Sequence, residues 1–409
     1  LGGRTHSFVD EASGNIVDNG QHLMMGCYRE TRSYLKTIGS EQLAPLQHAL
    51  HIDFLDPLKG PASLQASSFP APFHVLTGLM QLTNLSLSNR LRLLRVGREL
   101  LWSSKEKERL LDTMTVDGWL TSLGQSTENK SYLWDTIAIG SLNDHPNSVS
   151  ALLFFRVLRA AFMGTREDSC LLIPRTGLSS LLVDPAVKYI ADHKGEIRTN
   201  TRIQVMRTED NRIESVRTMA GRHFEATSYV LAVPYFDLPS LLPDKFELTH
   251  LDHFTSTPIV SINLWFDRKV FDGEFSAVLN SDIQWIFNRS QICPSPNKSG
   301  NGTQHLSLVI SGAAAYIDLE KDRIVEIALN DLRRVIPAVN AAKLVRSLVI
   351  KEKRATFSPK PGMETMRPDC RTKYGNLFLA GDWTNTGLPA TIEGAVLSGR
   401  TAAKAALNS

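Results

Sequence analysis

The residues best suited to do chemistry lie near the end of the chain. The apolar run 376–380 is followed by Gly381 and Asp382, and after a loop Thr391-Ile392-Glu393 opens a run of small residues at three- and four-residue spacing. Free N–H groups at a helix N-terminus suit a phosphate or an electron-rich ring edge, and Asp382 could bond a ligand hydroxyl. A lone Gly-Asp pair is more typical of an ordinary turn. Strand, turn, loop and helix together favour a cofactor site.

A second glycine-rich segment stands at the first residues. Gly2 and Gly3 would let the backbone pass close to a ligand, and Arg4 would reach a phosphate. Taken alone, these residues are more typical of a plain turn. The polar cluster 17–22, which contains His22, either lines a site or caps the apolar stretch after it.

The elements that must position these residues read as α/β structure. A helix is predicted at about 181–191, with strands at 203–205, 212–216 and 228–233. A β-meander that leads into a buried strand is typical of α/β architecture. Because ligands of open α/β sheets bind at the carboxyl ends of the strands, Asp382 would stand at the ligand edge.

The middle of the chain follows a different pattern. Residues 61–163 are predicted to be mostly helical, and the run 151–155 indicates a buried or interfacial helix. Strand-like runs at 259–266, 285–287 and 305–310 alternate well enough to form an antiparallel sheet covered by those helices.

Composition excludes several classes of protein. The chain has 409 residues, 42% of them hydrophobic, which suffices for two domains with cores. Its net charge of +3 is scattered, so no nucleic-acid partner is predicted. The four cysteines show no C-x-x-C spacing, so neither a metal site nor a disulfide framework is expected, and a reducing cytoplasmic setting fits best. No run approaches the roughly 20 apolar residues that span a bilayer.

Four segments together carry a family resemblance. The chain resembles the flavoprotein superfamily of amine oxidases and phytoene desaturases, and within it the squalene-associated FAD-dependent desaturases, the hydroxysqualene dehydroxylases of hopanoid biosynthesis. The segments are Leu1-Gly2-Gly3-Arg4, Asp18-Asn19-Gly20-Gln21-His22, Leu379-Ala380-Gly381-Asp382-Trp383-Thr384, and Gly387-Leu388-Pro389-Ala390-Thr391-Ile392-Glu393-Gly394-Ala395-Val396.

The resemblance implies an α/β fold (α+β overall) with FAD as cofactor. A discontinuous, Rossmann-like FAD-binding domain of the amine oxidase type would comprise residues 1–60, 166–240 and 351–409. A substrate domain of antiparallel sheet plus helices would comprise 61–165 and 241–350. The family's opening strand, G-x-G-x-x-G turn and helix do not precede Gly2, so we expect a truncated N-terminus and a weakened flavin site.

The resemblance also implies which residues contact FAD. Gly3 and Arg4 would lie at the phosphate or ribityl region, Asp382 at the ribityl chain, and Val205 against the adenine through its backbone. Val205 could equally be an ordinary strand residue. The implied cofactor-binding set is Gly2, Gly3, Arg4, Val205, Gly381, Asp382, Thr391, Ile392 and Glu393, the last three at the isoalloxazine.

The implied reaction replaces the hydroxyl of hydroxysqualene by hydrogen. It needs a general acid and a dry apolar tunnel. His22 is the candidate acid, with Asp144, His145 and Glu393 as weaker alternatives. The tunnel would be lined by Phe154, Phe155, Phe162 and Met163, and by Trp265 and Phe266 of the sheet.

A long isoprenoid substrate resides in lipid, so peripheral contact with the inner face of the membrane is expected. Residues 79–102, in which arginines alternate with leucines, could dock there or could be a solvated face of a buried helix. Two other functions stay open: a carotenoid desaturase or amine oxidase, and a flavin-free lipid-binding remnant. The sequence leaves the oligomeric state open.

Overall fold

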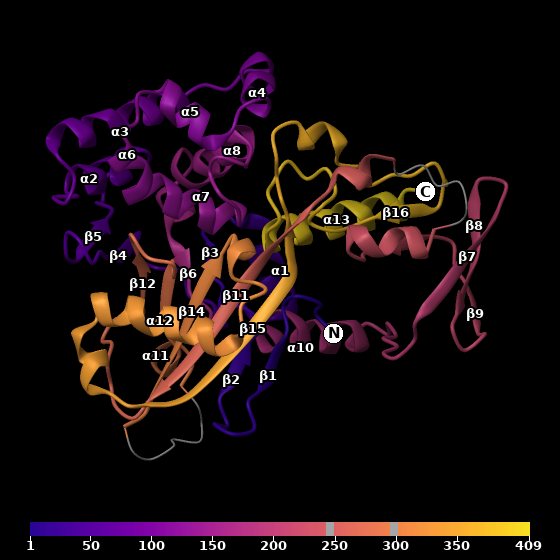
Figure 1. The fold of residues 1–409 in the computed structure, drawn as a ribbon. Helices are drawn as coiled ribbons and strands as arrows, with labels where there is room; N and C mark the ends of the chain where they lie inside the picture. Colours follow the sequence, from indigo (N-terminus) through magenta and orange to yellow (C-terminus); the bar gives the residue numbers. More distant parts are fainter. Residues whose placement is uncertain (243–248, 295–301) are drawn as a thin grey trace.

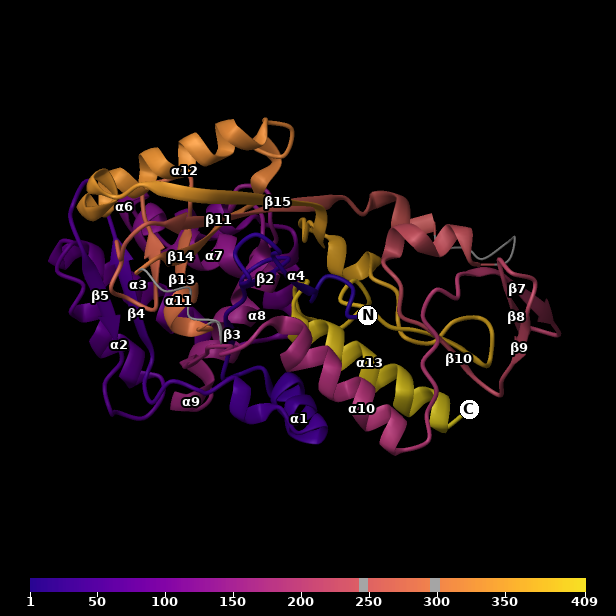
Figure 2. The same ribbon diagram turned by 90° about the horizontal axis from the view of Figure 1, so that it is seen from below.

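The computed structural model describes residues 1–242, 249–294 and 302–409. One end of the molecule holds a large sheet and a group of helices, and the other end holds the last helix and a small three-stranded sheet (Figures 1 and 2). The sequence predicted this mixture of helices and sheets, and the prediction is confirmed.

The large sheet has seven strands in the order β15-β11-β14-β13-β12-β4-β5, and every neighbouring pair except β12–β4 is antiparallel. The predicted antiparallel runs form its centre. The strands are β4 (His51–Leu55), β5 (Ala62–Gln65), β11 (Ser256–Phe266), β12 (Phe275–Val278), β13 (Trp285–Asn288), β14 (Gln304–Ser311) and β15 (Leu344–Phe357).

Side chains alternate between the two faces of this sheet. Val260, Ile262 and Leu264 of β11 pack in one hydrophobic cluster with α12 (Lys321–Val335). Ser261 and Asn263, which lie between them, therefore point to the opposite face. That second face is directed toward the helical region, whose core includes Phe287 of β13 and Val309 of β14.

The predicted helical region is present between β5 and β6. Its centre is α8, in which Phe154 and Phe155 are completely buried against Trp119 of α5. The helices are α2 (Phe73–Met80), α3 (Leu87–Leu100), α4 (Lys105–Asp112), α5 (Val116–Ser122), α6 (Thr127–Asn129), α7 (Asp135–Leu142) and α8 (Ala151–Phe162). Among the described residues, no helix combines the length and apolarity needed to cross a membrane.

The predicted cofactor region is built from segments far apart in the chain. Strands β10 (Tyr229–Leu231) and β16 (Leu377–Leu379) pair in parallel, and α13 (Ile392–Leu407) packs against both. The other elements are β1 (Ser7–Val9), β2 (Ile16–Asp18), β3 (Met24–Met25), α1 (Arg29–Ile38), α9 (Arg166–Ser169), β6 (Leu171–Leu172), α10 (Asp184–Asp192), β7 (Ile203–Glu209), β8 (Arg212–Thr218), β9 (His223–Glu225) and α11 (Arg289–Ile292).

Strand pairing bears on where one domain ends and the next begins. Strand β4 pairs with β12 and β5 pairs with β4, so residues 51–65 extend the sheet of the predicted substrate domain. We therefore propose a first boundary before β4, and not at residue 60. The predicted boundary at 350 falls inside β15, which pairs with β11 from Leu344 to Phe357, so we propose to place it after β15. The boundaries near 165 and 240 stay predictions.

Candidate functional site

The two ends of the chain meet at an ion pair. Arg4 Nη2 donates to Asp382 Oδ2 at 2.8 Å, and a second N–H of Arg4 donates to the carbonyl of Ala355 on β15. The side chain of Asp382 is almost buried, whereas that of Arg4 keeps 41% of its surface exposed. Two segments that the sequence marked separately are thus brought together, and the exposed part of the guanidinium remains available to a ligand.

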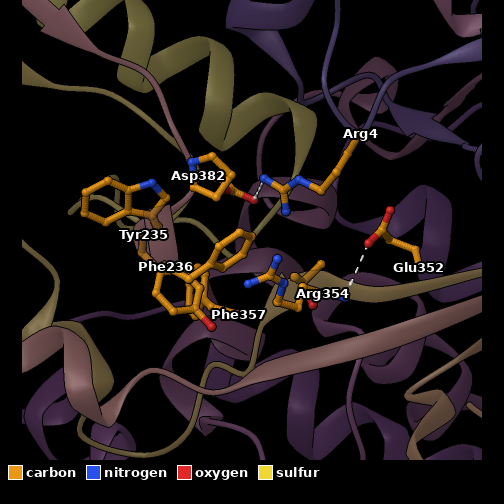
Figure 3. A pocket seen from close by; sticks show the side chains of 10 residues that line it. Arg4, Tyr235, Phe236, Glu352, Arg354, Phe357 and Asp382 are labelled. Carbon is orange, nitrogen blue, oxygen red and sulfur yellow. Dashed lines mark hydrogen bonds and ion pairs between the residues drawn. The ribbon is translucent and has the colours of Figure 1, made fainter. Parts of the chain in front are cut away.

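A cavity of about 120 Å³ opens beside this ion pair. Figure 3 shows Arg4 and Asp382 on one side and the rings of Tyr235, Phe236 and Phe357 on another. The Arg354 guanidinium lies 3.6 Å from the centre of the Phe236 ring. The lining residues are Arg4, Pro234, Tyr235, Phe236, Glu352, Arg354, Thr356, Phe357, Asp382 and Trp383.

Asp382 is positioned by the end of β16. Gly381 has φ +144°, and a Cβ built there would lie 2.3 Å from Nε1 of the buried Trp383. Only glycine fits this close approach. The Gly381 N–H also donates to Ser398 Oγ of α13 at 2.8 Å, which holds the strand end that carries Asp382 against this helix.

Arg367, which the sequence did not mark, holds the loop between Asp382 and α13. Its side chain is fully buried and donates to the carbonyls of Asp382, Thr384 and Leu388. A buried guanidinium needs several acceptors at once. No local pattern identifies such a residue, because these carbonyl partners lie 15 to 21 positions away, although Glu364, three positions away, also pairs with it.

Thr391 and Glu393, at the start of α13, make different kinds of contact. Thr391 is the N-cap, and its Oγ1 accepts from the Gly394 N–H at 3.1 Å. The Glu393 carboxylate instead turns to α1, where it accepts from the N–H groups of Glu30 and Thr31 at 2.9 and 2.8 Å and from the Thr31 hydroxyl at 2.7 Å. Glu393 therefore caps a neighbouring helix. Its carboxylate is used for these structural hydrogen bonds, which disfavours it as the proton donor.

His22 lies in the connection after β2. Its Nδ1 is 2.6 Å from the Gly20 carbonyl, so Nδ1–H donates there and Nε2 carries the lone pair in the neutral ring. Burial lowers the pKa of His22, and the positive charge of Arg4 acts in the same direction. His22 is thus a neutral hydrogen-bond acceptor near neutral pH, and it becomes an acid only at lower pH.

The remaining predicted residues are more scattered. Gly2 and Gly3 have φ of +88° and +55°, a backbone region that favours glycine, and a Cβ on Gly3 would meet open space. Val205 belongs to β7 in the three-stranded sheet β7-β8-β9, and it does not line the cavity with Arg4 and Asp382. Its proposed backbone contact with adenine stays a prediction.

The predicted tunnel residues do not share one surface. Phe266 packs in the cluster on the α12 side of the sheet, whereas Trp265, its neighbour in β11, stacks on His305 at 4.2 Å on the other face. Phe154 and Phe155 are core residues without exposed surface. Phe162 and Met163 lie at the margin of the same core, with Trp285 and Ile259 of the sheet. The prediction of Phe266 as a tunnel residue is wrong, because consecutive strand residues point to opposite faces.

These groups fit a flavin dinucleotide. An exposed guanidinium suits a phosphate, a nearly buried carboxylate at a strand end suits sugar hydroxyls, and the N-terminus of α13 supplies free N–H groups. Among solved structures, putrescine oxidase bound to putrescine shares the fold with a TM-score of 0.69 over 99% of this chain and 91% of that chain, at 16% identity. The fold is of the amine oxidase type, and together with the family match that follows, it defines a FAD-dependent oxidoreductase.

The family assignment follows from the sequence match. Residues 1–407 match the family of flavin containing amine oxidoreductases, and the chain belongs to it. A hydroxysqualene dehydroxylase of Rhodopseudomonas palustris is 28% identical over 415 residues, which cover 98% of this chain and 89% of that protein. A 15-cis-phytoene desaturase of Glycine max is 25% identical over 446 residues, covering 99% of this chain and 73% of that protein.

Proposed function

We propose that this flavoenzyme converts hydroxysqualene to squalene by reductive dehydroxylation. The observation that carries the proposal is the likeness, along nearly the whole of both chains, to a protein named hydroxysqualene dehydroxylase. The apolar margin formed by Phe162, Met163, Ile259 and Trp285, between the helices and the sheet, supports a long hydrocarbon substrate.

The reaction balances with one reductant. A C–O bond breaks, a C–H bond forms, and the departing oxygen takes up a proton to leave as water. Bound reduced flavin supplies the hydride. Arg4 and Asp382 would hold the cofactor, and the apolar margin would exclude bulk water and so limit side reactions. His22 stays the proposed acid, in its protonated form.

A direct assay tests this function. The purified protein, loaded with FAD and reduced without oxygen, is incubated with hydroxysqualene, and the products are analysed by mass spectrometry. We expect squalene in proportion to the flavin oxidised. Phytoene, offered to the oxidised enzyme in parallel, tests the second candidate that the likeness to phytoene desaturase favours. Desaturated phytoene without squalene would replace the proposal by that candidate.

We further propose that α3 docks on the cytoplasmic surface of an anionic membrane. Leu87, Leu91 and Leu94 are exposed along one side of this helix, and Leu101 and Trp102 at its end are 51% and 67% exposed. Exposed arginines lie between them, at positions 92, 95 and 98. Apolar side chains interleaved with basic ones suit an interfacial helix. Arg90 is an exception, because it turns inward to the carbonyls of Met80 and Leu85.

Sedimentation with lipid vesicles tests the docking helix. The wild-type protein should sediment with vesicles that contain anionic lipid and should be released by high salt. Leu91→Ser/Trp102→Ser should weaken this binding by about tenfold or more, because each buried apolar side chain contributes about 1.5–3 kcal/mol. Leu407→Ser, at an exposed leucine of α13, is the matched control. Equal binding of all three proteins would exclude α3 as the docking element.

A further inference from the structure

A buried ion pair lies beside the proposed active site. Arg289, the first residue of α11, and Asp18, the last residue of β2, keep only 3% and 2% of their side-chain surface exposed, and Arg289 Nη2 is 3.3 Å from Asp18 Oδ2. Arg289 Nη1 donates to Gln21 Oε1 at 2.5 Å, and Asp18 Oδ1 accepts from Ser7 Oγ and from the Leu178 N–H.

Four buried polar atoms of this region make no hydrogen bond with the described residues, although two of them, Asp18 Oδ2 and Arg289 Nη2, face each other in the ion pair. The four atoms are Asp18 Oδ2, Arg289 Nη2, Ser261 Oγ and Asn263 Nδ2, all buried. Ser261 and Asn263 lie on the face of β11 that points away from α12. The segment after Asp18 lies against this face, since a Cβ on Gly20 would be 3.4 Å from Ser261 Oγ. Asn263 in turn uses its Oδ1 to contact His305 Nε2 at 2.9 Å.

The cluster adjoins the flavin region through His22. The charges of Asp18 and Arg4 both act on the His22 ring, and a Cβ on Gly20 would lie 3.7 Å from its Cε1. The same cluster therefore borders the acid candidate on one side and the sheet on the other.

Burial of an incompletely bonded ion pair is costly. Removing two charges from water costs several kcal/mol, and a hydrophobic replacement of similar volume is often neutral or stabilising. Buried polar atoms in proteins nearly always have partners. A ligand hydroxyl both accepts and donates hydrogen bonds, and these atoms complement it. Arg289 Nη2 and Asn263 Nδ2 are donors, Asp18 Oδ2 is an acceptor, and the Ser261 hydroxyl can be either.

We propose that Asp18, Ser261, Asn263 and Arg289 bind the hydroxyl group of the isoprenoid alcohol and make the enzyme select alcohols over hydrocarbons. The inference rests on the proposed function and names the residues that determine its specificity. A site built to bond a hydroxyl rejects an analogue without it, because the buried polar groups are then left unpaired. The hydrocarbon product would leave the site for the same reason.

Equilibrium binding to the oxidised holoenzyme tests the inference, because oxidised flavin cannot deliver a hydride. Hydroxysqualene and squalene, in detergent micelles, are titrated against the flavin absorbance. We expect the wild type to bind the alcohol at least about tenfold more tightly than the hydrocarbon. In Asp18→Asn/Arg289→Met, which removes both charges and avoids an unpaired one, the preference should fall below about threefold while squalene binding persists.

The matched control is Asp10→Asn/Arg346→Met. This pair joins the same hairpin, β1–β2, to the same sheet, but its contacts are complete, at 3.0 and 2.5 Å. The control should keep the wild-type preference. Equal binding of alcohol and hydrocarbon by the wild type, or an undiminished preference in Asp18→Asn/Arg289→Met, would overturn the inference. Turnover is scored separately, so a wild type that prefers the alcohol but forms no squalene would refute the proposed reaction and leave this binding site standing.

Discussion

Arg4 illustrates how one residue can matter more for the cofactor than for folding. Its ion pair with Asp382 is half-exposed on the arginine side, and such pairs contribute at most about 1 kcal/mol to stability. We expect Arg4→Met to weaken FAD binding by about tenfold, because charge-assisted hydrogen bonds contribute about 1.5–3 kcal/mol, while the melting temperature changes little. Titration of the apoprotein with FAD, followed by flavin fluorescence, measures this.

Arg268→Met serves as the control for Arg4→Met. Arg268 also forms an ion pair with a neighbouring aspartate, but it lies on the exposed surface after β11. It should leave FAD binding unchanged. If Arg4→Met bound FAD as tightly as the wild type, Arg4 would be a purely structural residue.

The proton chemistry of His22 can be tested by its pH dependence. Burial lowers its pKa below the ordinary value of about 6.5. If protonated His22 is the acid, single-turnover squalene formation should rise as pH falls through this lowered pKa. His22→Gln should remove that rise and slow the reaction by about 10²–10⁴-fold at low pH. An unchanged pH profile in His22→Gln would assign the acid to another group.

At the scale of elements, Glu393 joins α13 to α1. Its carboxylate accepts two backbone N–H groups in the first turn of α1, where the helix dipole also favours a negative charge. Glu393→Ala would leave these buried donors unpaired and should lower the free energy of unfolding by about 1–3 kcal/mol. Urea denaturation measures the change.

Two further variants show whether the loss of unfolding free energy comes from the missing hydrogen bonds of Glu393. Glu393→Gln keeps one acceptor oxygen and should lose less stability than Glu393→Ala. Glu326→Ala, in an exposed i,i+3 pair with Arg323 on α12, should stay within about 0.5 kcal/mol of the wild type. A loss for Glu393→Ala no larger than that of Glu326→Ala would mean that the α13–α1 contact contributes nothing measurable.

At the scale of the whole molecule, buried histidine links stability to pH. Burial lowers the pKa of His305 to about 3, with the charge of Arg289 contributing and that of Asp10 opposing. The unfolded chain takes up this proton near pH 6.5, whereas the folded protein does not. The stabilisation is therefore complete above pH 6.5 and is lost as pH falls from 6.5 toward 3.

The expected slope is about 1.4 kcal/mol per pH unit for one such group. His305→Gln, which can still donate to Asn263, should show a shallower loss of stability between pH 6 and pH 5. Urea denaturation of both proteins at these two values gives the comparison. Parallel losses would show that His305 does not titrate differently in the two states.

The sequence alone determined the local elements around the site. Alternating apolar residues predicted three of the seven strands of the large sheet, β11, β13 and β14. The order of strand, Gly381-Asp382, loop and small-residue helix predicted β16, the turn and α13. These signals are local, because side-chain periodicity and turn chemistry act over a few residues.

Only the tertiary structure decided which distant groups meet. The partners of Arg289 include Gln21, 268 positions away, and the Glu393 carboxylate bonds α1, 362 positions away at Thr31. Likewise, alternation separated Trp265 from Phe266, but only packing against α12 showed which of them faces the helical region. Such contacts depend on how the elements pack. A charged residue needs a specific partner only where it is buried, and the local sequence pattern does not show which charged residues will be buried.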